Sequence, residues 1–244
     1  MLQIFNIQHF SVGDGDGIRT TVFFHGCNLR CPWCHNPESL TQAAISGLRC
    51  RQMSAESVLA EILEDRDYYA DGGGVTFSGG EVLLQAENAA KLARMVREAD
   101  ISLFVDTAGC VPYRAFEALN PFTDVYLFDY KTASAAKYAS VIGGDLALVR
   151  ENLFRLLADG KDVRIRIPLI PGFNTDPASV DALRADLSDF GIRRVWLLPF
   201  HRLGSGKYET LGLEYAYRHT PPLAKETLAA IADRFAADFT VSIE

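Results

Sequence analysis

The stretch Cys27-Asn28-Leu29-Arg30-Cys31-Pro32-Trp33-Cys34-His35-Asn36 contains three of the five cysteines of the chain, at the spacing C-x3-C-x2-C. It follows an apolar run, Thr21-Val22-Phe23-Phe24, which has the composition of a buried strand. A loop with this spacing can wrap three thiolates around one face of a metal centre. The number is informative, because structural zinc sites and electron-transfer clusters usually have four protein ligands. Three thiolates on a four-iron cluster instead leave one iron open to a substrate.

A structural zinc site is the main alternative for this stretch. It requires a fourth ligand, and His35 and Cys50 are the available candidates. Neither stands at the spacing that zinc sites usually show between their two ligand pairs. A zinc-stabilised binding module without catalysis is therefore the less favoured interpretation, and a disulfide framework is less favoured still.

Two further motifs accompany the cysteines in a fixed order. Asp14-Gly15-Asp16-Gly17-Ile18-Arg19 precedes them, and Ser78-Gly79-Gly80-Glu81 follows them. Together with the cysteines and the adjoining His35-Asn36-Pro37-Glu38, these motifs resemble the radical S-adenosylmethionine (SAM) superfamily, and within it the glycyl radical enzyme activating enzymes. The resemblance extends over nearly the whole chain.

The resemblance implies a reaction and its participants. One [4Fe–4S] cluster, held by Cys27, Cys31 and Cys34, binds SAM at its open iron and cleaves it reductively to a 5′-deoxyadenosyl radical. That radical takes a hydrogen atom from a backbone glycine of a partner glycyl radical enzyme, either pyruvate formate-lyase or a related lyase or decarboxylase. A flavodoxin- or ferredoxin-type protein supplies the electron. A radical SAM enzyme that acts on a small molecule is the alternative function.

Many activating enzymes carry a ferredoxin-like insert with additional cysteines after the cluster loop. Here residues 39–53 are too few for such an insert, and only Cys50 lies among them. We therefore expect one cluster, with Cys50 and Cys110 as ordinary thiols.

Composition narrows the class of protein. A chain of 244 residues can bury about 70–75% of its unfolded surface, enough for one large core. The net charge of −7 argues against a general nucleic-acid-binding surface, which would be basic. No apolar run approaches the ~20 residues that span a membrane, and the N-terminal residues lack signal-peptide features. Five cysteines, three of them clustered, fit a reducing cytoplasm. We expect one cytoplasmic domain, residues 1–244.

Strand and helix patterns alternate along the chain, which favours an α/β fold with a mostly parallel sheet. Apolar runs predict six strands, at 20–25, 75–78, 101–106, 125–129, 163–169 and 195–199. Helical periodicity predicts helices at 55–69, 87–99, 146–159, 177–190 and 225–235, and a short apolar segment follows at 239–243. Six strand–helix units predict an open, partial (β/α)6 TIM-like barrel, as the resemblance also implies. The length of the chain does not by itself exclude a closed eight-stranded barrel.

Polar residues follow the carboxyl ends of these strands, where barrel-like folds place their active sites. They include the three cysteines, Gly79-Gly80-Glu81, Asp106-Thr107, Asp129 with Lys131, Arg166 and His201. This combination suits a zwitterionic ligand with a ribose beside a metal cluster. Taken singly, the glycines could form a tight turn, Asp129 and Lys131 a surface ion pair, and His201 a cap or a surface side chain.

The resemblance assigns roles to these residues. Gly80 and Glu81 hold the SAM amino group, Asp129 and Lys131 contact the ribose and carboxylate, and Arg166 and His201 contact bound SAM. The backbone of Trp33 and His35 lines the adenine, while the Trp33 ring is expected to pack. Asp106 and Thr107 are a candidate site for a monovalent cation.

The early glycine-rich loop does not match a phosphate-binding motif, because it precedes a strand and lacks the G-x-G-x-x-G spacing. In the family the loop reads D-G-P-G-I-R, and Asp16 replaces its proline here. We expect this change to loosen the backbone of the loop. Asp14 is the candidate contact to the glycine-bearing segment of the partner.

Overall fold

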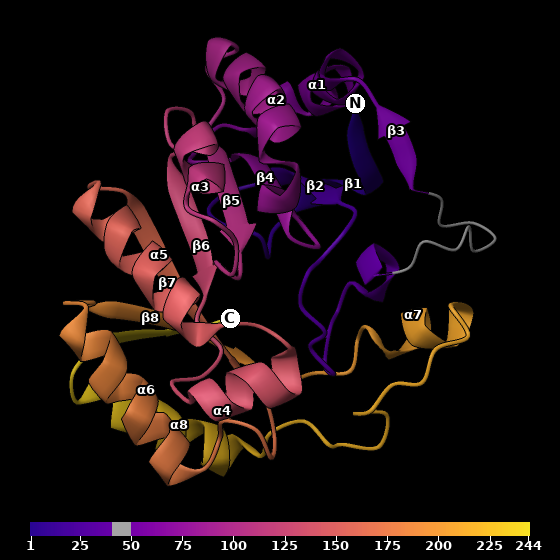
Figure 1. The fold of residues 1–244 in the computed structure, drawn as a ribbon. Coiled ribbons are helices and arrows are strands. Elements are labelled where there is room, and N and C mark those ends of the chain that lie inside the picture. Colours follow the sequence, from indigo (N-terminus) through magenta and orange to yellow (C-terminus); the bar gives the residue numbers. More distant parts are fainter. Residues whose placement is uncertain (41–49) are drawn as a thin grey trace.

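The computed structural model describes residues 1–40 and 50–244. In this part of the chain, nine strands form one curved sheet in the order β3-β1-β2-β4-β5-β6-β7-β8-β9 (Figure 1). The strands are β1 (Leu2–Ser11), β2 (Arg19–Phe24), β3 (Arg51–Met53), β4 (Gly74–Gly79), β5 (Leu103–Thr107), β6 (Val125–Asp129), β7 (Asp162–Leu169), β8 (Arg194–Pro199) and β9 (Thr240–Ile243). From β2 to β9 neighbouring strands pair in parallel, whereas β1 is antiparallel to β2 and β3.

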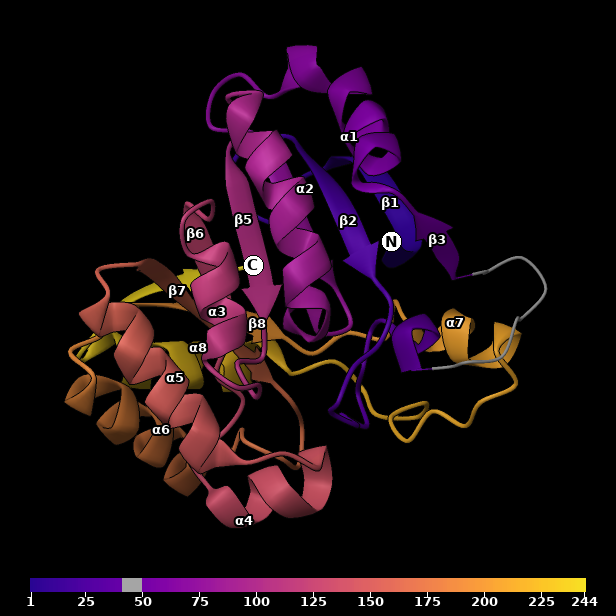
Figure 2. The same ribbon diagram turned by 45° about the horizontal axis from the view of Figure 1, so that its top comes forward.

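Helices follow the parallel strands and cover the outer face of the sheet (Figure 2). They are α1 (Ala55–Glu64), α2 (Ala86–Glu98), α3 (Arg114–Leu119), α4 (Ala135–Lys137), α5 (Leu146–Ala158), α6 (Pro177–Asp189), α7 (Ser205–Thr210) and α8 (Lys225–Ala236). A π-helical turn, Tyr138–Ile142, continues α4. Within the described residues, none of these helices is long and apolar enough to cross a membrane.

The predicted alternation of strands and helices is confirmed, and the sheet stays open as expected. Asp145 caps α5 by accepting the Ala147 N–H at 2.9 Å, and Asp176 caps α6, which begins at Pro177. The segment after α8 forms β9 beside β8 and thus adds a seventh parallel strand to the six predicted. The carboxyl ends of β2 and β5 point toward the side that carries α4 and α7 (Figure 2).

The structure differs from the sequence expectations in several elements, and strand β3 and the short helices α3, α4 and α7 had not been predicted. The helix predicted at 55–69 ends at Glu64, because the buried Asp65 carboxylate accepts bonds from Thr20 and pairs with His9 instead of continuing the turn. Strand β1 was not predicted at all. Its pairing with β2 shifts register between Ile4 and Asn6, and this bulge interrupts the alternation by which a strand is recognised.

Residues 41–49, where the sequence predicts that an insert is missing, lie outside the described residues.

Candidate active site

The three clustered cysteines lie in the loop that follows β2, at the carboxyl end of the parallel strands. All three are free thiols of intermediate exposure. The backbone N–H of Leu29 donates to Cys27 Sγ at 3.4 Å, and that of Asn36 donates to Cys34 Sγ at 3.4 Å. N–H groups directed at sulfur stabilise thiolates, so the loop is arranged for anionic ligands.

Burial raises the pKa of all three thiols, to about 12 for Cys27 and about 11 for Cys34. Without a metal these groups are therefore protonated, and binding a metal must displace their protons. Among residues 1–40 and 50–244, no three His, Cys, Asp or Glu side chains gather closely enough to hold a single metal ion. A mononuclear zinc site binds all of its ligands at one ion, whereas a polynuclear cluster binds each thiolate at a different iron.

The Gly-Gly-Glu segment ends β4 and packs directly on the base of the cysteine loop. Gly80 donates to the Phe24 carbonyl at 2.9 Å, and Glu81 donates its backbone N–H to the Gly26 carbonyl at 2.8 Å. A Cβ atom at Gly80 would lie 2.0 Å from the Gly26 oxygen. The glycines therefore allow two segments of backbone to approach each other closely.

The Glu81 side chain is 1% exposed and makes bonds within the protein. Its carboxylate accepts from Thr107 Oγ1 at 2.8 Å and from the Ala108 and Leu83 N–H groups at 3.0 and 3.2 Å. Burial raises its pKa to about 7. Glu81 thereby connects the end of β4 to the end of β5.

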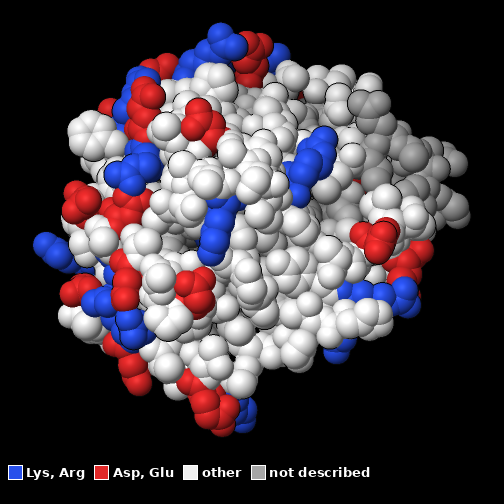
Figure 3. All heavy atoms as spheres, turned by 60° about the horizontal axis from the view of Figure 1, so that its bottom comes forward, with Lys and Arg blue, Asp and Glu red and all other residues white. Residues whose placement is uncertain are grey.

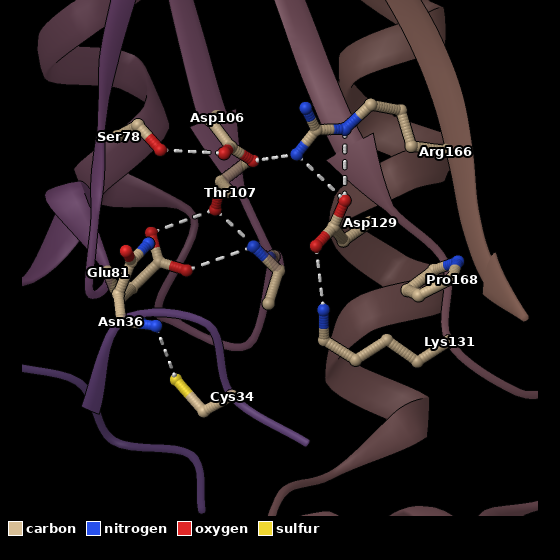
Figure 4. A network of polar contacts seen from close by, with 12 residues as sticks. Cys34, Asn36, Ser78, Glu81, Asp106, Thr107, Asp129, Lys131, Arg166 and Pro168 are labelled. Carbon is tan, nitrogen blue, oxygen red and sulfur yellow. Dashed lines mark hydrogen bonds and ion pairs between the residues drawn. The ribbon is translucent and has the colours of Figure 1, made fainter. Parts of the chain in front are cut away.

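A chain of alternating charges crosses the inside of the barrel (Figure 4). Ser78 Oγ donates to Asp106 at 2.8 Å, and Arg166 Nη2 bonds Asp106 Oδ1 at 2.6 Å. The same guanidinium donates through Nε to Asp129 Oδ1 at 3.1 Å, and Lys131 Nζ binds Asp129 Oδ2 at 2.8 Å. Asp129 and Lys131 both point inward, so the surface-pair alternative for them is wrong.

Burial and pairing act against each other in this network. Burial alone would lower the pKa of Lys131 and Arg166, but the adjacent aspartates offset it and raise both values. Burial would raise the pKa of Asp129, yet Lys131 and Arg166 lower it. Lys131 also counteracts the effect of burial on the Cys31 thiol, which places the cationic end of the network beside the cysteine loop.

The segment after β8 packs on the other side of the cysteine loop. The His201 and His35 rings lie 4.3 Å apart, and burial followed by the charge of His201 lowers the pKa of His35 to about 4. The Trp33 ring is 5% exposed and packs 4.6 Å from Phe173, which confirms that its ring serves packing. His201 itself is exposed and lies at the open rim.

The glycine-rich loop between β1 and β2 lies at the amino ends of the parallel strands, away from the cysteines. The Asp14 carboxylate accepts bonds from Ser11 and Thr21 at 2.5 and 2.8 Å. Asp16 forms a two-bonded ion pair with Arg164 of β7, at 2.7 and 2.9 Å. The Asp16 side chain thus connects the loop to β7 on the opposite wall of the barrel, and the expected loosening of the loop backbone stays a prediction.

Some residues of the site were missed by sequence reasoning. Ser78 ends the apolar run of β4, and Lys207 and Tyr208 lie in α7, where they bond the backbone of the cysteine loop. A Gly-Ser-Gly-Lys-Tyr run just beyond His201, on the same rim, was the available signal. Cys50 is exposed and Cys110 is buried, and both are free thiols as expected.

Comparison with known families agrees with the class that the open barrel and its three thiols define. The model of the radical SAM superfamily matches residues 21–181. The chain belongs to this superfamily, whose members use a [4Fe–4S] cluster and SAM. The three free thiols and the zwitterionic network fit these two groups in donor chemistry.

Within the superfamily, the chain is one of the glycyl radical enzyme activating enzymes. It is 35% identical to pyruvate formate-lyase 2-activating enzyme of Escherichia coli strain K12, with 98% of this chain and 92% of the relative covered. It is 33% identical to the benzylsuccinate synthase activating enzyme of Thauera aromatica, with coverage of 89% and 84%. A solved domain of pyruvate-formate lyase-activating enzyme from Bacteroides vulgatus shares the fold, with a TM-score of 0.59, 22% identity and coverage of 71% of this chain and 99% of that domain.

The alignments with the two relatives span 268 and 278 positions, more than the 244 residues of this chain. Those relatives therefore contain stretches without a counterpart here, which agrees with the prediction of a missing insert. The number of clusters stays a prediction.

Proposed function

We propose that Cys27, Cys31 and Cys34 hold one [4Fe–4S] cluster, and that SAM binds between this cluster and the charged network inside the barrel. The observation that carries the proposal is the position of three free thiols beside a charged network, on the rim of an open barrel (Figure 4). When bound, the two groups supply reductive cleavage of SAM to a 5′-deoxyadenosyl radical, which removes a hydrogen atom from a glycine of the partner.

The network supplies complementary charges for a zwitterionic ligand. Lys131, beside Cys31, would receive the SAM carboxylate, and Asp129 would accept from the ribose hydroxyls. Lys131 and Asp129 are bonded to each other at 2.8 Å. On SAM binding, each of them would exchange this bond for a bond to SAM. Arg166 holds Asp129 and Asp106 in place from the opposite side.

The remaining predicted contacts form the edges of this SAM site. Gly80 would present its backbone to the SAM amino group, and Glu81 would support that turn from its buried position. The backbone of Trp33 and His35, with the exposed His201 ring, would line the adenine. All of them adjoin the cysteine loop or its carboxyl-end neighbours.

We further propose that a monovalent cation binds beside Asp106 and Thr107 when SAM is present. Arg166 and Ser78 already bond the two Asp106 oxygens, and Thr107 Oγ1 donates to Glu81. A cation there would compete with the guanidinium, so its binding should depend on bound SAM.

The partner is a glycyl radical enzyme, and the named relatives favour pyruvate formate-lyase or another lyase. On the face in Figure 3, two basic side chains stand near the middle, and an area without charged side chains lies below and to the right of them. Depletion of charge is typical of the core of protein–protein interfaces, so this uncharged area is the proposed contact surface for the partner. Asp14 acts electrostatically on Asp106 inside the barrel, and it is the proposed contact to the part of the glycine-bearing segment that extends into the barrel from the carboxyl-end face. A flavodoxin- or ferredoxin-type donor would supply the electron, in the cytoplasm, where free thiols persist.

The test starts with anaerobic reconstitution with iron and sulfide, followed by reduction with dithionite in the presence of SAM. The expected result is about four irons per chain, together with 5′-deoxyadenosine, and loss of both in Cys31→Ala. Cys50→Ala is the matched control and should behave as the wild type. Incubation with candidate glycyl radical enzymes should then produce a glycyl radical signal in electron paramagnetic resonance. Product formation that persists in Cys31→Ala, or stoichiometric zinc without product, would contradict the proposal.

A further inference from the structure

A short segment after β8 encloses the last cysteine of the cluster loop. We name residues 201–217, which include α7, the α7 clasp. Within it, Tyr208 donates its hydroxyl to the Cys34 carbonyl at 2.9 Å. Gly204 lies against the backbone of His35, where an added Cβ would meet the His35 Cα at 3.3 Å. The two segments are separated by some 170 positions in sequence, so the contact is purely tertiary.

Lys207 is the most connected side chain of the α7 clasp. Its ammonium group donates to the His35 carbonyl at 2.9 Å and to Asn36 Oδ1 at 3.2 Å. It also forms an ion pair of 3.0 Å with Glu38, whose side chain is 5% exposed. Three oxygens from one short stretch, 35–38, thus converge on a single cation and match its three N–H donors.

Asn36 links Lys207 to Cys34, the proposed cluster ligand. Its side-chain oxygen is held by Lys207, while its side-chain amide donates to the Gly79 carbonyl at 3.1 Å. Its backbone N–H donates to Cys34 Sγ at 3.4 Å. Lys207 therefore orients the residue that connects the Cys34 sulfur to the end of β4.

Aromatic side chains support the α7 clasp from behind. The Tyr208 and Tyr215 rings lie 4.5 Å apart, and Tyr217 packs edge-on against Trp33 at 6.2 Å. Because Trp33 directly precedes Cys34, both the polar and the apolar contacts act on the same turn of the loop.

We propose that Lys207 and Tyr208 are positioning residues for Cys34, which fix the third cluster ligand before the cluster binds. This inference rests on the proposed function, because it assumes that Cys34 ligates the cluster. Residues that orient metal ligands typically contribute 10–100-fold to metal affinity. Lys207 would have a second effect, because a positive charge beside the Cys34 turn would favour the reduced, more negative state of a bound cluster.

The test compares Lys207→Met, Tyr208→Phe and the control Lys225→Met, an exposed lysine of α8. Each variant is reconstituted anaerobically, and the loss of iron to a chelator is followed by absorbance. The midpoint potential of the cluster is measured by a redox titration with electron paramagnetic resonance. Tyr208→Phe removes one hydroxyl and retains the aromatic ring, so it is expected to fold. It therefore tests the inference even if Lys207→Met does not fold.

We expect Lys207→Met to lose iron about 10-fold faster or more than wild type and to shift the cluster potential to more negative values. Tyr208→Phe should also lose iron faster, with an unchanged potential, because no charge is removed. Lys225→Met should match wild type in both measurements. Iron loss at the wild-type rate in both Lys207→Met and Tyr208→Phe would overturn the inference. A wild-type protein that assembles no cluster would refute the proposed function instead.

Discussion

Replacing Arg166 by methionine tests whether the charged network is held together by this one guanidinium. Arg166 Nη2 lies 2.6 Å from Asp106 Oδ1 and 3.0 Å from Asp129 Oδ1. In Arg166→Met, both carboxylates remain inside the barrel with Lys131 as the cation bonded to Asp129. Methionine keeps much of the side-chain volume, so the charge is the main change.

The magnitude follows from burial. Removing one partner of a buried ion pair costs about 3–5 kcal/mol. The Arg166 side chain is 10% exposed and each aspartate 20%, so some solvent reaches the carboxylates. We therefore expect the lower end, a loss of about 3 kcal/mol in the free energy of unfolding at pH 7. Arg164→Met is the matched control on the same strand. Its partner Asp16 is 58% exposed, and such exposed pairs contribute about 1 kcal/mol or less.

The assay is urea-induced unfolding of the metal-free protein at pH 7 and pH 5.5. Burial already raises the pKa of Asp106, and Arg166 opposes that rise. In Arg166→Met the folded pKa of Asp106 should rise further above its unfolded value. Such a group destabilises the fold at high pH and loses this effect as the pH falls through its folded pKa. The deficit relative to wild type should therefore shrink at pH 5.5. A deficit no larger than that of Arg164→Met, or one that grows at pH 5.5, would refute the reasoning.

Three further predictions concern the surroundings of the network. Gly80→Ala places a Cβ 2.0 Å from the Gly26 oxygen. It should lower the free energy of unfolding, measured with urea, by about 2–3 kcal/mol and impair iron retention. The control Gly13→Ala places its Cβ in open space and should change neither. The pKa of Glu81 is raised from 4.5 to about 7, so its protonated form stabilises the fold at low pH and this contribution is lost as the pH rises through 7. Wild type should thus lose stability from pH 6 to 8 relative to Glu81→Gln, and parallel profiles would contradict this. Burial raises the pKa of Cys27 to about 12 and that of Cys34 to about 11, so iron binding should release protons, which a pH indicator would detect. For the same reason the affinity for iron, measured with a competing chelator, should increase from pH 7 to 8.5.

Local sequence signals predicted most of the fold. Apolar runs between polar stretches located the parallel strands, and Asp145, Asp176 and Pro177 marked helix starts through bonds made within a few residues. Strand β1 was not predicted, because its bulge depends on pairing with β2. The helix predicted at 55–69 was too long for a similar reason, since the contacts of Asp65 with Thr20 and His9 are distant in sequence.

Local patterns in the sequence are enough to predict the chemistry of this protein. The cysteine spacing, the Gly-Gly-Glu turn and the polar residues at strand ends are local patterns, and the topology of a parallel barrel brings strand ends to one rim. The bonds that join these groups follow only from the folded structure. It paired Arg166 with two aspartates from neighbouring strands, tied Asp16 to Arg164 across the barrel, and placed Lys207 on the cysteine loop. Such contacts depend on side-chain geometry between segments far apart in the chain, and no local propensity encodes that geometry.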